Sequence, residues 1–425
     1  MHRGLIGRLA VWVWFFTFIA GTAQAAGARP DWPGPTDQIK HVFVIILENE
    51  GFAAAFGPKS PATYLSQTLP TQGVLLEQYY STGHVSLDNY ISMISGQAAT
   101  LQTRTDCPIY QDYTLTGVTA DGQAIGSGCV YPATIQTLPD QLAGAGLTWR
   151  GYMEDMGNDP QRESSTCGHP VLGTQDMTQI AEAPSATVPL GDQYASRHDP
   201  FVYFHSIIDS PNCQKNVVAL PQLASDLASE ATTPNLVFVT PNLCNDGHDA
   251  PCKNGQPGGL VSADQFLRKW VPMIMASPAY QGGLLIVTFD EADLDIEEGS
   301  AGVLVTAPGT TCCSQQPGPN LGPFPESTQE TGYTLTFGSF GGDQIGAVLL
   351  SPFLQPGSVS DTPFNHYSML RSIEDIFALG HLGYAGSPGL IGFFGCASTD
   401  IKPSPPQPSS EGCSSVTQRA FPLKR

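Results

Sequence analysis

Four short apolar runs stand out along the chain, and polar residues follow the longest two. The first covers residues 39–47 (IKHVFVIIL) and the second covers residues 284–289 (LLIVTF). Both are apolar on both faces and rich in β-branched residues, which is typical of strands buried inside a parallel sheet. Residues 235–240 and 346–350 predict two further short central strands. The pattern therefore predicts a sheet with these four runs at its centre.

Helical patterns alternate with these strands, and this alternation predicts an α/β fold with a mostly parallel sheet covered by helices. Two stretches rich in Gly, Thr, Ser and Pro, residues 102–130 and 300–340, are predicted to be loops or insertions over the site. The predicted helices cover residues 138–145, 220–231, 264–275 and 368–379.

The N-terminal 25 residues have the pattern of a secretory signal peptide. Arg3 and Arg8 precede an apolar segment, residues 9–20, and Ala23 and Ala25 supply the small residues of a cleavage site. An uncleaved anchor is the alternative interpretation. No other stretch approaches the ~18 apolar residues that a membrane span needs. We therefore expect a secreted or periplasmic protein without a transmembrane segment in the mature chain.

Ten cysteines follow the predicted signal, and an even number in an exported chain favours disulfides. The absence of a C-x-x-C pair argues against a structural zinc site. The adjacent Cys312 and Cys313 are expected to bond to different partners. Three local pairs are plausible: Cys107–Cys129, Cys244–Cys252 and Cys396–Cys413.

Charge narrows the possible functions. The chain carries 18 Lys and Arg against 38 Asp and Glu, a net charge of −20, and this argues against nucleic-acid binding through phosphate contacts. Removing Arg3 and Arg8 takes the basic count to 16 and the net charge to −22. With 41% hydrophobic and 13% charged residues, the composition is that of a globular protein, not a disordered one.

Polar residues at the ends of two predicted strands form the first candidate site. Glu48 and Asn49 follow the first strand, and Asp290 and Glu291 follow the second. Ligands of open α/β sheets bind at the carboxyl ends of strands. Three carboxylates and one amide oxygen suit a hard divalent cation. The alternative is that each pair only caps the helix that follows it.

A second candidate site lies in the segment HVSLDNY, residues 84–90. It precedes an apolar helical stretch and so puts Ser86 near a helix N-terminus, where backbone N–H groups favour an anion such as phosphate. An adjacent metal ion would activate Ser86 as a nucleophile, and Asn89 would donate to a phosphoryl oxygen. A plain N-cap serine is the alternative. The chain lacks G-x-S-x-G, H-E-x-x-H and P-loop patterns.

Three further histidines stand in polar surroundings. His248 lies in CNDGHD, His366 lies in FNHYS just before a predicted helix, and His198 lies in RHDP. Each is a candidate general acid or phosphate contact. Each is also compatible with a purely structural role.

Four blocks, taken together, resemble the phosphoesterase family that groups bacterial acid phosphatases with non-specific phospholipases C. They are residues 41–57 (HVFVIILENEGFAAAFG), 84–96 (HVSLDNYISMISG), 287–293 (VTFDEAD) and 364–377 (FNHYSMLRSIEDIF), and they occur in the family's order. The resemblance implies an alkaline-phosphatase-like α/β sandwich. Together with the residue patterns at the two ends, it divides the chain into a signal peptide, residues 1–25, one phosphoesterase catalytic domain, residues 26–396, and a Pro/Ser-rich tail, residues 397–425.

The resemblance also implies a role for each matched residue. Ser86 would form a phosphoserine intermediate. Asn89 and His198 are predicted to contact the substrate. The predicted metal ligands are Glu48, Asn49, Asp290 and Glu291, and the predicted proton-handling or phosphate-binding histidines are His84, His248 and His366.

The branch of the family bears on the substrate. Phospholipase members have a motif similar to D-E-x-G-G-x-x-D-H. This chain has DEADLD at residues 290–295, without the glycine pair. Residues 149–156 (WRGYMEDM) look like the acid-phosphatase branch. We therefore predict a phosphomonoesterase acting on a small phosphate ester. A phosphodiesterase or phospholipase C acting on a phospholipid is the alternative, and a non-catalytic binding protein is a third interpretation.

The three core site motifs contain no basic residue. An acidic protein that binds phosphate there needs a local positive centre, so one divalent metal ion is predicted. Its oxygen-rich ligands favour Ca²⁺, with Zn²⁺, Mn²⁺ and Mg²⁺ as alternatives.

Overall fold

The central sheet contains all four predicted strands. The structure is a computed structural model that describes residues 35–299, 302–330, 333–395 and 418–420. The described residues belong to the compact unit Gly34–Arg425. The predicted signal peptide lies outside the described residues, as does most of the predicted tail.

Three fully buried strands form the middle of the sheet. Strand β1 (His41–Leu47) lies between β10 (Leu236–Thr240) and β11 (Gly283–Phe289) and runs parallel to both. Their Val, Ile, Leu and Phe side chains are buried on both faces, which explains the continuous apolar runs. The whole order is β19-β17-β2-β16-β11-β1-β10-β7-β9. The outer strands are β2 (Val74–Leu76), β7 (Trp149–Met153), β9 (Val217–Ala219), β16 (Ala347–Leu350), β17 (Ser358–Ser360) and β19 (Gln418–Ala420).

The predicted α/β class is confirmed, although the sheet is mixed. Strand β16 runs antiparallel to both β11 and β2, and β19 runs antiparallel to β17. A short buried apolar run looks the same in either direction, so hydrophobic pattern alone could not reveal the reversal.

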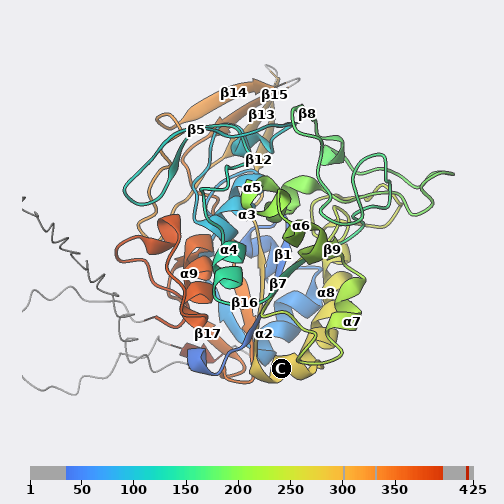
Figure 1. Ribbon diagram of the computed structural model, residues 1–425, viewed down its shortest axis with the longest axis vertical. Coiled ribbons are helices and arrows are strands. Elements are labelled where there is room, and N and C mark those ends of the chain that lie inside the picture. The colour runs from blue at the N-terminus through green and yellow to red at the C-terminus, as the bar shows by residue number, and fades with distance from the viewer. Residues whose placement is uncertain (1–34, 300–301, 331–332, 396–417, 421–425) are drawn as a thin grey trace, which may run out of the picture. The chain divides into compact units, whose positions relative to one another are not determined.

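Helices cover both faces of the sheet (Figure 1). On one side lie α3 (Ser86–Ser95), α4 (Leu138–Gly144) and α9 (His366–Ile376), and on the other lie α7 (Gln222–Asp226) and α8 (Gly259–Met275). Shorter helices are α1 (Phe52–Ala55), α2 (Leu69–Gln72), α5 (His205–Ile208) and α6 (Pro211–Asn216).

Two of the four predicted helices differ most from their bounds in the structure. Helix α8 starts earlier than residue 264. Helix α7 is much shorter than the predicted residues 220–231. The hydroxyls of Thr232 and Thr233 each donate to the carbonyl oxygen of Asp226 at 2.9 Å, so side chains take the place of the next helical turn.

Residues 300–340, predicted to be loops or insertions, contain strands that the sequence analysis did not identify. A four-stranded sheet, named here the insert sheet, has the order β12-β13-β15-β14 and lies at the top of Figure 1. Alternating residues of β13 and β15 build its own small core from Val305, Ala307, Leu335 and Phe337. Residues 102–130 are mostly loop but include a β5–β6 hairpin. The bounds are β12 (Asp295–Gly299), β13 (Gly302–Ala307), β14 (Glu326–Glu330), β15 (Tyr333–Phe337), β5 (Thr114–Val118) and β6 (Ala124–Ser127).

Disulfides pair every described cysteine. The predicted bonds Cys107–Cys129 and Cys244–Cys252 are confirmed, and Cys167–Cys213 is a further one. The expectation for Cys312 and Cys313 was wrong, because they bond to each other while the other described cysteines pair among themselves. Cys396 and Cys413 lie outside the described residues. Four disulfides fit an oxidising compartment. Within the described residues, no helix has the length and apolar character needed to cross a membrane.

Candidate active site

The two polar strand ends meet, as the sequence predicted. Strands β1 and β11 end in register, with Leu47 opposite Phe289. The backbone N–H of Asn49 donates to Asp290 Oδ1 at 3.1 Å, and the N–H of Glu291 donates to the same oxygen at 2.6 Å. The carboxylate of Asp290 therefore joins the two strand ends.

Ser86 is the first residue of α3 and points at this edge of the sheet. Its Oγ donates to Glu48 Oε2 at 2.8 Å, and the hydroxyl of Tyr90 donates to Glu48 Oε1 at 2.6 Å. Val85 precedes the helix with a φ of 87°, a strained conformation for a β-branched residue. Its N–H donates to Glu291 Oε2 at 3.1 Å, which holds the turn in place. This turn, held by Glu291, sets the direction of Ser86.

A third strand end completes a buried group of side chains, named here the acidic cluster: Glu48, Asp246, Asp290 and His198. Asp246 follows β10, and its Oδ2 lies 3.4 Å from His198 Nδ1. The other ring nitrogen of His198 lies 3.4 Å from Glu48 Oε2. Ligand atoms of Glu48, His198 and Asp246 all lie within 4.8 Å of one another, and all three residues are buried.

Sequence reasoning missed Asp246, although the rule that identified Glu48 and Asp290 also covers a loop after β10. His198 was predicted as a substrate contact, and the structure instead places it between two carboxylates.

The acidic cluster carries more negative charge than the nearby Arg197 offsets. Burial raises the pKa of Glu48 and of Asp246 well above the ordinary value, and that of Asp290 is raised for the same reason. Burial, followed by the charges of Arg197 and His248, lowers the pKa of His198 well below its usual value. A neutral imidazole among carboxylates is a set of metal donors. Three buried oxygens without a hydrogen-bond partner among the described residues add to it: Asn49 Oδ1, Asp246 Oδ2 and Asp290 Oδ2. These residues therefore fit a divalent cation.

His84 lies between two carboxylates beside the cluster. Its Nδ1 is 2.5 Å from Glu291 Oε2, and its Nε2 is 2.9 Å from Asp343 Oδ2. Burial alone lowers the pKa of His84, but the two carboxylates outweigh it and raise that pKa to about 10. The imidazolium is therefore held by both ring nitrogens. Glu291 was predicted as a metal ligand. In the structure its Oε2 accepts hydrogen bonds from His84 Nδ1 and from the Val85 N–H.

Asp343 connects His84 to the insert sheet. Its Oδ2 also accepts from the N–H of Gly309 at 3.1 Å, in the loop after β13. Arg104 makes a second contact with the insert sheet. It donates to Glu326 Oε2 at 2.7 Å and lies 4.1 Å from the ring centre of Phe337. No motif pointed to Asp343, because its partner is 259 residues away in the chain.

Two predicted residues hold the backbone of the site. Asn89 Oδ1 accepts from the N–H groups of Thr82 at 2.9 Å and Gly83 at 3.0 Å, and its Nδ2 donates to the Gly83 carbonyl at 2.9 Å. The amide of Asn89 is thus used by the turn that leads to Ser86. His366 Nε2 lies 2.6 Å from the carbonyl oxygen of Asp290, and burial lowers the pKa of His366 to about 4.

His248 is the most exposed of the predicted histidines, with 31% of its side chain accessible. Its Nδ1 lies 2.9 Å from Asp249 Oδ1, and its Nε2 lies 3.3 Å from a guanidinium nitrogen of Arg197. Arg197 also lies 3.5 Å from Asp106, whose other oxygen accepts from the N–H of Leu87 in α3 at 2.9 Å. A buried cation therefore connects His248 to the start of the serine helix.

Comparison with known proteins defines the class first: the chain is a hydrolase that acts on phosphoric esters. It belongs to the phosphoesterase family, which matches residues 59–380. Three of the four blocks that carried the resemblance lie in this range, and residues 41–57 precede it.

Two curated relatives span most of the chain. The phosphatidylinositol-3-phosphatase of Mycobacterium tuberculosis is 23% identical over 371 residues, covering 85% of this chain and 88% of the relative. A probable acid phosphatase of Kluyveromyces lactis is 22% identical and covers 81% of this chain, but this chain spans only 59% of that protein.

Similar solved structures include a protein in the alkaline phosphatase superfamily from Vibrio parahaemolyticus. It has a TM-score of 0.44 and 10% identity, with 80% of this chain and 67% of that chain covered. Murine ectonucleotide pyrophosphatase/phosphodiesterase 5 has a TM-score of 0.42 and 10% identity, with 80% and 96% covered.

Proposed function

We propose that the protein is an exported, metal-dependent phosphomonoesterase of the acid-phosphatase branch, with Ser86 as its nucleophile. The observation that carries the proposal is the contact of Ser86 Oγ with Glu48 at 2.8 Å, at the head of a ten-residue helix and beside the acidic cluster. Relatives named as acid phosphatases and as a phosphatidylinositol phosphatase support a monoester substrate.

The acidic cluster would hold one divalent cation. Glu48, Asp290, Asp246 and His198 are the proposed ligands, with Asn49 as a further oxygen donor. An imidazole in this set suits Zn²⁺ or Mn²⁺ better than the Ca²⁺ that the sequence favoured. The ion, when bound, supplies positive charge that stabilises the serine alkoxide and the phosphate oxygens.

The protein's own groups orient the reaction. Glu48 accepts the hydrogen bond of Ser86 and so fixes the direction of Oγ. The N-terminus of α3 and the fixed imidazolium of His84 favour an anion beside it. His248 is the proposed residue that binds phosphate or handles protons, because it alone among the predicted histidines reaches solvent. Water then hydrolyses the phosphoserine.

The test is the hydrolysis of p-nitrophenyl phosphate by Ser86→Ala, with Ser95→Ala as the matched control. Ser95 is the last residue of the same helix, is also buried, and donates to the Ile91 carbonyl at 2.6 Å. Ser86→Ala should lower turnover at least about a thousandfold, whereas Ser95→Ala should stay close to wild type. Wild-type turnover in Ser86→Ala would remove Ser86 as the nucleophile.

A substrate panel with and without chelator tests the rest of the proposal. The monoester should be hydrolysed faster than bis(p-nitrophenyl) phosphate or phosphatidylcholine, and chelation should stop the reaction. Preference for either diester would favour a phosphodiesterase or phospholipase C. Inactivity on every ester, together with absence of metal by elemental analysis, would favour a binding protein.

A further inference from the structure

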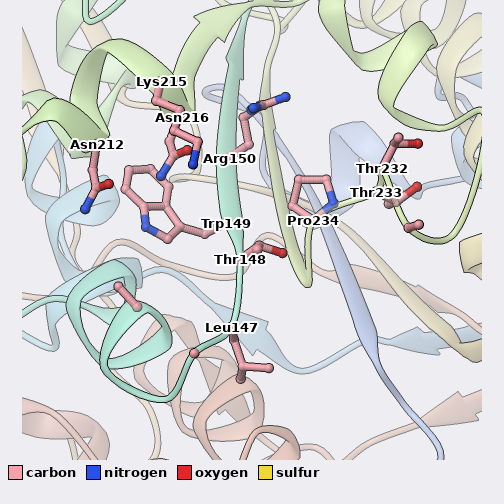
Figure 2. A pocket seen from close by; sticks show the side chains of 13 residues that line it. Leu147, Thr148, Trp149, Arg150, Asn212, Lys215, Asn216, Thr232, Thr233 and Pro234 are labelled. Carbon is pink, nitrogen blue, oxygen red and sulfur yellow. The ribbon is translucent and has the colours of Figure 1, made fainter.

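A separate cavity of about 360 Å³ lies at the opposite end of the sheet (Figure 2). The first residues of β7 line it, together with residues 232–234, which lead into β10. Strands β7, β10 and β1 are parallel, and Glu48 follows the carboxyl end of β1. The cavity therefore lies at the amino ends of the strands, away from the acidic cluster, and its volume suits a small molecule.

The charged side chains that line this cavity are both cations, Lys215 and Arg150, and no Asp or Glu lines it. This is unusual in a chain with 18 basic and 38 acidic residues. Among the described residues, Lys215 forms no ion pair with its exposed side chain. A ligand that bears negative charge is the partner that such a lining favours.

Neutral hydrogen-bond donors accompany the two cations. Figure 2 shows Asn212, Asn216 and Lys215 beside the indole ring of Trp149, on one side of β7. Within the described part of the chain, the side-chain amides of Asn212 and Asn216 form no hydrogen bond. Two free amides and one free ammonium group therefore face a common space.

Arg150 is held in position on the other side of the strand. One guanidinium nitrogen donates to Asp226, which also accepts from the hydroxyl of Tyr152 at 2.7 Å. The Nε of Arg150 has no partner among the described residues. Asp226 anchors the arginine but does not itself line the cavity. Asp226 thus offsets the charge of Arg150, and among the described residues Lys215 is the cation of this lining without an ion pair.

We propose that this cavity is a binding site for a small anion, a phosphate or a carboxylate, held on the Trp149 side of β7 by Lys215 and the two asparagine amides. The site is distinct from the catalytic centre, and the proposal does not depend on the role of Ser86.

Trp149 provides the signal for a direct test. The full-length protein is titrated with inorganic phosphate and, separately, with citrate, each at constant ionic strength set with sodium chloride. Comparison with Trp149→Phe isolates the fluorescence of Trp149. We expect a saturable change with at least one anion, and the response to phosphate against citrate identifies which kind of anion the site prefers.

The lysine variant and its control decide the outcome. Lys215→Ala should raise the dissociation constant at least about tenfold, as loss of a charge-assisted hydrogen bond does. Lys59→Ala, which removes another exposed lysine, should leave it unchanged. Both variants should hydrolyse p-nitrophenyl phosphate as wild type does, which shows that they are folded. Absence of a saturable response to either anion, or an unchanged dissociation constant in Lys215→Ala, would overturn the proposal.

Discussion

The two ends of the sheet carry side chains of opposite charge. At the carboxyl ends, Glu48, Asp246 and Asp290 are buried together, and two of them have an orphaned oxygen. At the amino ends, Lys215 and Arg150 line a cavity that no carboxylate enters. The net charge of −20 describes neither end. Ligands are recognised by the charges that folding leaves uncompensated, not by the sum over the chain.

Burial separates the two ends in a second way. Carboxylates removed from water carry a large free-energy cost that only a cation or a proton can relieve. Lys215, by contrast, stays in water and costs little. We therefore expect activity to require the metal ion at the carboxyl ends of the strands. The anion at the amino ends should not be required for activity.

The largest effect should come from removing charge at the carboxyl end. Asp246→Asn takes one proposed ligand from the acidic cluster, and both bound metal and turnover should fall, turnover by at least about 100-fold. Metal content is measured by elemental analysis and turnover with p-nitrophenyl phosphate. Asp375→Asn, an exposed carboxylate paired with His381, is the control and should change neither. Full metal content in Asp246→Asn would exclude Asp246 from the metal site.

A smaller effect is expected from Asp343, the residue that connects the insert sheet to His84 at the carboxyl ends of the strands. Asp343→Asn removes the negative charge that faces His84 Nε2 at 2.9 Å and frees the imidazolium to move. Because Asp343 acts through His84, kcat should fall roughly tenfold while KM changes less. Asp121→Asn, an exposed site in the turn between β5 and β6, serves as control. An unchanged kcat in Asp343→Asn would mean that the insert sheet does not position His84 for catalysis.

The smallest effect concerns a buried carboxylate that belongs to neither end. Glu374 in α9 accepts from the N–H of Leu382 at 2.9 Å, and burial raises its pKa to about 9 from an ordinary value of 4.5. Its folded form thus prefers the proton, so its contribution to stability is complete below pH 4.5 and is lost as the pH rises towards 9.

Thermal unfolding between pH 5 and 9 measures this contribution. The melting temperature of wild type should fall across the range, and Glu374→Gln should flatten the fall by roughly 2 °C. The variant keeps an acceptor for the Leu382 N–H, so it should remain folded. A wild-type slope in Glu374→Gln would show that the proton on Glu374 contributes nothing to the pH dependence of stability.

Local patterns predicted much of the candidate active site. Each polar pair that follows an apolar strand was recognisable, and β1 and β11 indeed bring Glu48 and Asp290 to one edge. Ser86 begins a helix as expected. These features depend on residues within a few positions of one another, so periodicity and strand-end rules could reveal them.

Contacts between distant segments were beyond such rules. Asp246 lies beside Glu48 because β10 pairs with β1. Asp343, which follows the insert sheet in the chain, contacts His84, which is 259 residues away. The antiparallel direction of β16 likewise depends on how distant segments pack.

The sequence by itself determined the α/β class, the strand-end oxygen donors and the serine at the head of a helix, because each follows from local spacing and residue chemistry. Only the tertiary structure decided how these groups are used. It turned Asn89 and His366 to the backbone, fixed His84 between two carboxylates and moved His198 into the acidic cluster. The physical reason is that a buried polar group takes the partner that folding brings to it, and that partner can lie hundreds of residues away.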